Sequence, residues 1–330
     1  MLIPSVREIK AEAAHAMSRA REPKKVILPY VAIMVLLASL LTVTNALLSD
    51  RIAGTGGLAN FGIRSVLSTV QSVLPMFQSA VMLALEFGYL HAILRMSRGQ
   101  YADHTDLKVG IQKFMPVLRL TLWRYVIICG LAMSLLYLSV QLFLLTPFAN
   151  PLVELLTPMV SIAGTDPMAM MDDATMSAAY STMTPMLILY AVLCCIVIIP
   201  ISYRFRMANY VLLDDPRGQG FAALKTSVRI MRRNGFQLFK LDLSFWWYYG
   251  LLIFANVLAY GDMILAMLGI PLPFDSNVAF YLFFFAYLVA LFAIYYFLRN
   301  PVEMAYAKAY DAIRDKPVDN GVVLGNIFDI

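Results

Sequence analysis

Residues 26–48 read VILPYVAIMVLLASLLTVTNALL, an apolar run without a charged side chain. A hydrocarbon core of about 30 Å requires roughly 20 helical residues of this kind. The alternating pattern of a membrane barrel is absent, and the backbone amides of a segment in lipid must find their hydrogen bonds inside that segment. The run therefore predicts a membrane-spanning helix.

The rest of the chain repeats this character. Of its 330 residues, 60% are hydrophobic and 14% are charged, against roughly 25% charged in an average soluble domain. Six runs are long enough to cross a bilayer, namely residues 26–48, 66–94, 117–145, 186–213, 241–268 and 278–298. We predict an all-α, polytopic membrane helix bundle, with residues 1–330 forming a single integral membrane domain.

The basic residues predict the orientation. Of the 26 Lys and Arg residues, 24 lie before the first span, after the last, or in the connections that follow the even-numbered spans, counted with the flanking ends of those spans. Only Arg51 and Arg64 lie on the other side. Because Lys and Arg accumulate in cytoplasmic loops, both termini are predicted to be cytoplasmic, with an outer loop at 146–185 and a cytoplasmic tail at 299–330.

Amphipathic basic segments precede the first, third and fifth spans. The first opens with Ser5 and Glu8 in a capping-box spacing. The second aligns four apolar residues, Leu107, Ile111, Phe114 and Leu118. The third aligns Phe221, Leu224, Val228 and Met231. Such helices are predicted to lie in the headgroup plane.

The third segment carries the most concentrated positive charge. Its four cations are Lys225, Arg229, Arg232 and Arg233. We expect them to contact anionic lipid headgroups of the inner leaflet. No nucleic acid is expected as a partner, because the cations lie where membrane topology already requires them.

Three ionisable residues lie at membrane depth. At 1.5 Å per residue, Glu86, Arg124 and Arg204 are each about 12–15 Å inside the inner boundary. We predict that Glu86 pairs with Arg124, or failing that with Arg204, since a lone charge there is costly. The alternative is that both arginines extend to the headgroups while Glu86 is protonated.

The outer loop is long and rich in methionine. Residues 152–162 are apolar but too short to span, which predicts a surface-lying or re-entrant helix, and residues 166–183 are expected to form another helix. The methionines are irregularly spaced without His or Cys, which favours packing over a Cu(I) site. We therefore expect no metal and no cofactor.

One stretch resembles a known family. It contains Asp214, Asp215 and Pro216, then Ser227 and Met231 in a basic helix, then Leu243, Ser244 and Phe245. This pattern is similar to the bacterial integral membrane family filed as domain of unknown function 975, although Trp246-Trp247 replaces that family's usual Gly-Trp. The resemblance implies a multi-pass protein of a bacterial cytoplasmic membrane without an assigned activity.

Two functions remain open from the sequence. The first is a non-enzymatic membrane protein that organises lipids or binds partner membrane proteins, favoured by the three basic interfacial helices and by the scarcity of polar residues within the spans; no catalytic motif is found. The second is a small-solute transporter or permease component, favoured by Pro75, Pro200 and the charges at membrane depth.

The segments Arg98-Gly99-Gln100 and Arg217-Gly218-Gln219 open two of the basic connections. They are consistent with an internal duplication, and equally with the repetition that any set of membrane hairpins shows.

Overall fold

A computed structural model describes residues 4–20, 23–54, 61–146, 173–215, 218–232, 234–267 and 276–314. Within these ranges the chain is helical and has no strand, which confirms the all-α fold. Two compact units are present, unit 1 (Met1–Leu120 with Met207–Ile330) and unit 2 (Thr121–Arg206).

The helices of unit 1 are α1 (Val6–Arg19), α2 (Lys24–Gly54), α3 (Phe61–Ser97), η2 (His104–Leu107), α4 (Lys108–Gln112), α8 (Ala208–Asp214), α9 (Gly220–Met231), α10 (Gly235–Ser244), α11 (Trp246–Ala259), α12 (Gly261–Met267), α13 (Ser276–Ile294), the π-helical turn η5 (Tyr295–Arg299) and α14 (Asn300–Arg314). Helix α5 (Phe114–Leu144) begins in unit 1 and continues into unit 2, which also holds α7 (Asp173–Arg204).

Five helical segments are long and apolar enough to cross a membrane, or six if the bent pair α10 and α11 forms one span. The five are Lys24–Ile52, Gly62–Ser97, Phe114–Leu144, Met183–Asp214 and Val278–Arg314. They coincide with the first four predicted runs and the sixth. The protein is therefore a multi-pass membrane protein by length and composition.

The fifth run, 241–268, contains a bent pair of helices rather than one straight helix, so its assignment as a span stays a prediction. Helices α10 and α11 meet at Phe245 with a bend of 63°. The apolar residues of α10 alternate with Lys240 and Asp242, whereas α11 carries no charge. A count of hydrophobic residues treats α10 and α11 as one apolar segment. The charged residues of α10 favour a polar environment, whereas the uncharged α11 favours lipid.

The segment after residue 298 is also more than a tail. Helix α13 continues through η5 into α14, which packs against α1 and α3. Buried residues recur on α14 at helical spacing, namely Val302, Ala305, Tyr306, Ala309, Tyr310 and Ile313. This spacing marks an amphipathic helix whose apolar face is covered by protein. Residues 315–330 lie outside the described part.

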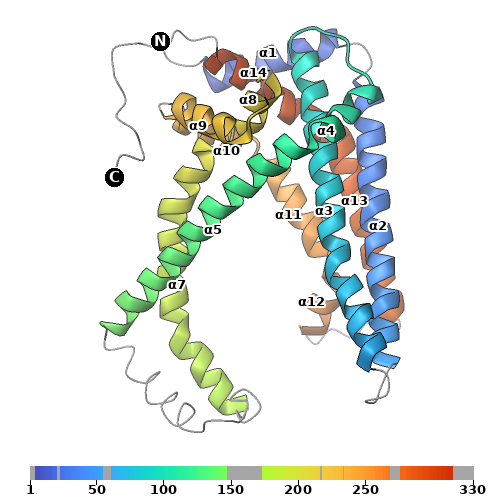
Figure 1. The fold of residues 1–330 in the computed structure, drawn as a ribbon, viewed down its shortest axis with the longest axis vertical. Helices are drawn as coiled ribbons and strands as arrows, with labels where there is room; N and C mark the ends of the chain where they lie inside the picture. Colours follow the sequence, from blue (N-terminus) through green and yellow to red (C-terminus); the bar gives the residue numbers. More distant parts are fainter. Residues whose placement is uncertain are drawn as a thin grey trace. The chain divides into compact units, whose positions relative to one another are not determined.

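The packed core lies at one end of unit 1. The buried residues of α2 end at Met34, and those of α3 begin at Ala84. Beyond these points large apolar side chains such as Leu40 and Met76 are exposed, as expected for surfaces that face lipid. Helices α1, α8 and α14 gather at the packed end, from which α2 and α3 extend (Figure 1). We call this the polar end.

The first basic segment forms α1 as predicted. The Glu8 N–H donates to the Ser5 hydroxyl at 3.3 Å, and the Ser5 N–H donates to the Glu8 carboxylate at 2.7 Å. This capping box satisfies two backbone donors at the helix start. The buried residues Ile9 and Ala13 lie on the face that contacts α14, so protein covers much of the apolar face of α1.

The second basic segment departs from the expected single helix. It divides into η2 and α4 before α5 begins, and Ile111 is exposed. Close contact between backbones explains the change, because a Cβ added to Gly110 would lie 1.7 Å from the Ala84 carbonyl oxygen. Helix α4 lies so near α3 that only glycine fits at this position.

In unit 2, α7 begins at Asp173, inside the predicted outer loop, and continues without interruption into the fourth span. Phe143 of α5 packs against Met183 and Met186. The helix expected over 152–162 and most of the methionine-rich segment lie outside the described residues.

Candidate functional site at the polar end

The charged cluster at the polar end starts from the turn after α3. The Gln100 N–H bonds the Arg95 carbonyl and the Gly99 N–H bonds the Met96 carbonyl, each at 3.0 Å. Gly99 has φ +76°, in the left-handed region where glycine is favoured. The turn holds Arg98 beside α8 and α14.

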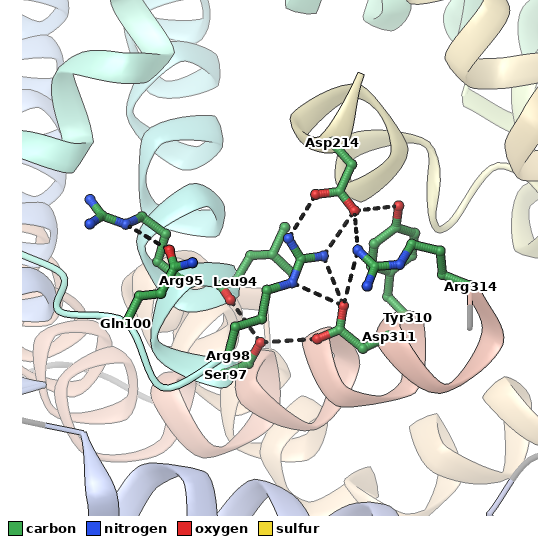
Figure 2. Close-up of polar contacts among 9 residues, drawn as sticks. All are labelled: Leu94, Arg95, Ser97, Arg98, Gln100, Asp214, Tyr310, Asp311 and Arg314. Atoms are coloured by element: carbon green, nitrogen blue, oxygen red, sulfur yellow. Dashed lines mark hydrogen bonds and ion pairs between the residues drawn. The ribbon is translucent and has the colours of Figure 1, made fainter. Parts of the chain in front are cut away.

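Arg98 joins three helices. Its Nη1 and Nη2 donate to the two carboxylate oxygens of Asp214 at 2.8 Å each, a bidentate pair with the end of α8. Its Nη2 also donates to Asp311 of α14 at 2.8 Å (Figure 2). Bidentate, charge-assisted bonds of this kind are among the strongest that side chains form.

Asp214 accepts two further hydrogen bonds from α14, at 2.9 Å from Arg314 and 3.0 Å from the Tyr310 hydroxyl. Two arginines thus face two aspartates, so the cluster is neutral as a whole. The hydrogen bonds that Arg98 donates, to Asp214 foremost and then to Asp311, raise the pKa of Arg98 above its usual value. We call Arg98, Asp214, Tyr310, Asp311 and Arg314 the polar lock.

A second cluster surrounds Arg299 in η5. Its side chain is only 7% exposed, and its Nη2 lies 3.2 Å from a carboxylate oxygen of Glu86. The guanidinium carbon lies 4.8 Å from the ring centroids of Tyr30 and Tyr295, and 5.1 Å from that of Tyr89. Aromatic faces stabilise a desolvated cation, which helps to explain how this arginine is buried.

Glu86 therefore pairs with Arg299, a residue that the sequence analysis placed in the cytoplasmic tail. Arg124 and Arg204 belong to unit 2, where each makes an interaction of its own. Their expected pairing with Glu86 stays a prediction.

The third basic segment forms α9, but its apolar stripe is divided. Leu224 and Met231 are buried, together with Ser227, whereas Phe221 is 47% exposed. Close packing at Gly220 contributes, since a Cβ there would lie 2.7 Å from the Leu120 backbone nitrogen. Protein therefore covers the stripe at Leu224 and Met231, and the placement of this helix in the headgroup plane stays a prediction.

The cations of α9 point away from this packed face. Lys225, Arg229 and Arg232 are exposed, and within the described ranges none of them forms an ion pair; Arg233 lies outside those ranges. Helix α10 adds the exposed cation Lys240 and the exposed aromatic residues Phe236 and Phe239. We call the exposed residues Phe221, Lys225, Arg229, Arg232, Phe236, Phe239 and Lys240 the α9–α10 surface.

The residues that carry the family resemblance have mainly structural roles. Asp214 belongs to the polar lock, and Asp215 accepts a hydrogen bond from the Gln219 N–H at 3.3 Å. The Ser244 carbonyl accepts one from Lys10 at 3.0 Å. Phe245 is buried, Leu243 is exposed, and Pro216 lies outside the described residues.

Comparison with known proteins adds no relative: no family model matches the chain, and neither does any curated protein or solved structure. The likeness to domain of unknown function 975 therefore remains a resemblance. Within the described residues, no three His, Cys, Asp or Glu side chains gather as a metal-binding group. The chemistry of the polar end, as described, is that of ion pairs.

Several residues of the two clusters that the sequence did not indicate lie on η5 and α14, namely Arg299, Tyr310, Asp311 and Arg314. The helical spacing of apolar residues from Val302 to Ile313 is the signal that predicts a packed helix there. The spacing does not predict the ion-pair partners of α14, because these lie at the ends of α3 and α8.

Proposed function

We propose that this chain is a non-enzymatic integral membrane protein that binds and organises anionic lipid headgroups through its α9–α10 surface. The proposal rests on a difference between two groups of basic residues at the polar end. Arg98, Arg299 and Arg314 have carboxylate partners, whereas Lys225, Arg229 and Arg232 are exposed and form no ion pair within the described residues.

The neighbouring aromatic residues fit the same role. Phe221 of α9 and Phe236 and Phe239 of α10 are exposed, and the Lys240 ammonium lies 4.7 Å from the Phe236 ring centroid. Mixed cationic and aromatic surfaces suit the headgroup region, where rings reach the acyl boundary and cations meet phosphates. Each Lys or Arg near an anionic surface contributes about 1 kcal/mol.

The proposal also includes an orientation and a membrane. The polar end faces the cytoplasm, both termini lie there, and the membrane is the cytoplasmic membrane of a bacterium. The positive-inside rule supports the orientation, and the family resemblance supports the bacterial membrane.

An environment-sensitive fluorophore on Phe221→Cys tests the lipid role, in a chain whose three cysteines are replaced by alanine. In nanodiscs, phosphatidylglycerol should shift the emission to the blue relative to phosphatidylcholine. Changing Lys225, Arg229 and Arg232 to Gln should abolish that shift. Equal emission in the two bilayers would refute the proposal.

Transport is the second candidate, favoured by the Arg299 cluster. The Arg299 Nε lies 4.0 Å from a Glu303 carboxylate oxygen and has no hydrogen-bond partner within the described residues. A buried charge in a π-helical turn near a span is a frequent feature of functional sites. Solute leakage from protein-containing vesicles that is lost in both Glu86→Gln and Arg299→Gln would favour this candidate.

A further inference from the structure

A half-open cleft of about 510 Å³ lies at the polar end, between α1, α14 and the bend at Phe245. Its lining is mostly apolar and includes Met17, Phe245, Pro301 and Ala305. Lys10 and Ser18 supply its polar side chains. The volume lies within the range of about 300–1,000 Å³ that small-molecule sites occupy.

Lys10 is held at the wall of this cleft. Its ammonium donates to the Ser244 carbonyl at 3.0 Å and lies 4.1 Å from the centroid of the Phe245 ring. Within the described residues no carboxylate forms an ion pair with it. An ammonium has three donors, and the carbonyl accepts only one. Partial burial lowers the pKa of Lys10, so an anion beside it would replace solvation that this side chain has lost.

The cleft lies where the uncharged helix α11 begins. Helix α11 starts directly after Phe245, and Trp246 is 70% exposed. Exposed tryptophan at the end of an apolar helix is typical of the boundary between headgroups and acyl chains. Arg7 lies one turn before Lys10 on α1 and is exposed, which adds positive charge on the same side of the helix.

We propose that this cleft binds one anionic phospholipid, with its phosphate at Lys10 and part of an acyl chain against Met17, Phe245 and Ala305. The combination of a cation without a carboxylate partner and an apolar lining matches the two chemistries of that molecule. Phosphate is a strong acceptor for an ammonium, and the acyl chain would cover apolar side chains of the half-open cleft. The site goes beyond the α9–α10 surface, because it is a discrete site for a single lipid.

Native mass spectrometry of the full chain in mild detergent tests the site, with phosphatidylglycerol as the probe. The natural chain should bind one such lipid more tightly than phosphatidylcholine. Lys10→Gln should weaken the binding about fivefold, the contribution of one basic residue near an anionic lipid. Lys10→Arg should keep it. Ala14→Trp adds bulk from an exposed helix position beside the cleft and should also reduce binding.

Lys225→Gln is the matched control, because it removes the same charge from the α9–α10 surface. It should leave the tightly bound lipid in place even if the proposed role of that surface is correct. Unchanged phosphatidylglycerol binding in both Lys10→Gln and Ala14→Trp would overturn the cleft site. Equal affinity for phosphatidylcholine would overturn the assignment of an anionic ligand.

Discussion

The polar lock makes a quantitative prediction about coupling between α3 and α8. Arg98→Gln leaves one positive charge opposite two aspartates, and Asp214→Asn leaves two arginines opposite one. Each single variant therefore strands a charge that the natural cluster neutralises. The double variant restores one positive charge and one negative charge, so it should cost less than the sum of the two single variants.

The size of the effect follows from exposure. The Arg98 and Asp214 side chains are 28% and 24% exposed, between the surface and buried cases. Exposed pairs contribute about 0.2–1 kcal/mol, whereas breaking a buried pair costs about 3–5 kcal/mol. We expect each single substitution to lower the free energy of unfolding by about 2 kcal/mol, with a coupling energy of about 1 kcal/mol.

Unfolding by a denaturing detergent, followed by tryptophan fluorescence, measures these free energies. Arg232→Gln is the control, since it removes an exposed arginine with no ion pair in the described part of the chain, and it should change stability by less than about 0.5 kcal/mol. Arg98→Lys should recover only part of the loss, because lysine cannot form the bidentate contact. Additivity of the two single variants to within about 0.3 kcal/mol would refute the coupling.

Three other predictions use the same or simpler measurements. Arg299→Lys should destabilise the protein by at least about 1 kcal/mol, because an ammonium loses the contact of the planar guanidinium with the tyrosine rings. If this variant is as stable as the natural protein, these contacts do not stabilise it. Gly110→Ala should cost at least about 1–3 kcal/mol through its clash with α3, while Gly250→Ala, which meets nothing within 4 Å, should be neutral or stabilising; equal effects would show that α4 does not lie so close. Labelling of single cysteines in intact cells should reach Ser177→Cys and spare Ser5→Cys until the cells are opened, and the reverse order would overturn the orientation.

Local sequence was sufficient to predict several elements. The uncharged run at 26–48 is helical in any arrangement of the bundle, because the bilayer leaves its backbone no other way to satisfy its hydrogen bonds. The capping box of Ser5 and Glu8 needs only residues three apart. The same reasoning did not indicate the bend at Phe245 within residues 241–268, where Phe245 contacts Lys10 of α1 and Tyr306 of α14, both far away in the chain.

The sequence by itself determined which segments are apolar enough for lipid and on which side the basic residues accumulate, because both are sums over neighbouring residues. Only the tertiary structure decided which charges meet. Arg98 lies 116 residues from Asp214 and 213 from Asp311, and Glu86 lies 213 from Arg299. Such pairings require α8 and α14 to pack beside α3, and that packing depends on the shapes of buried side chains along all three helices rather than on the pattern within any one of them.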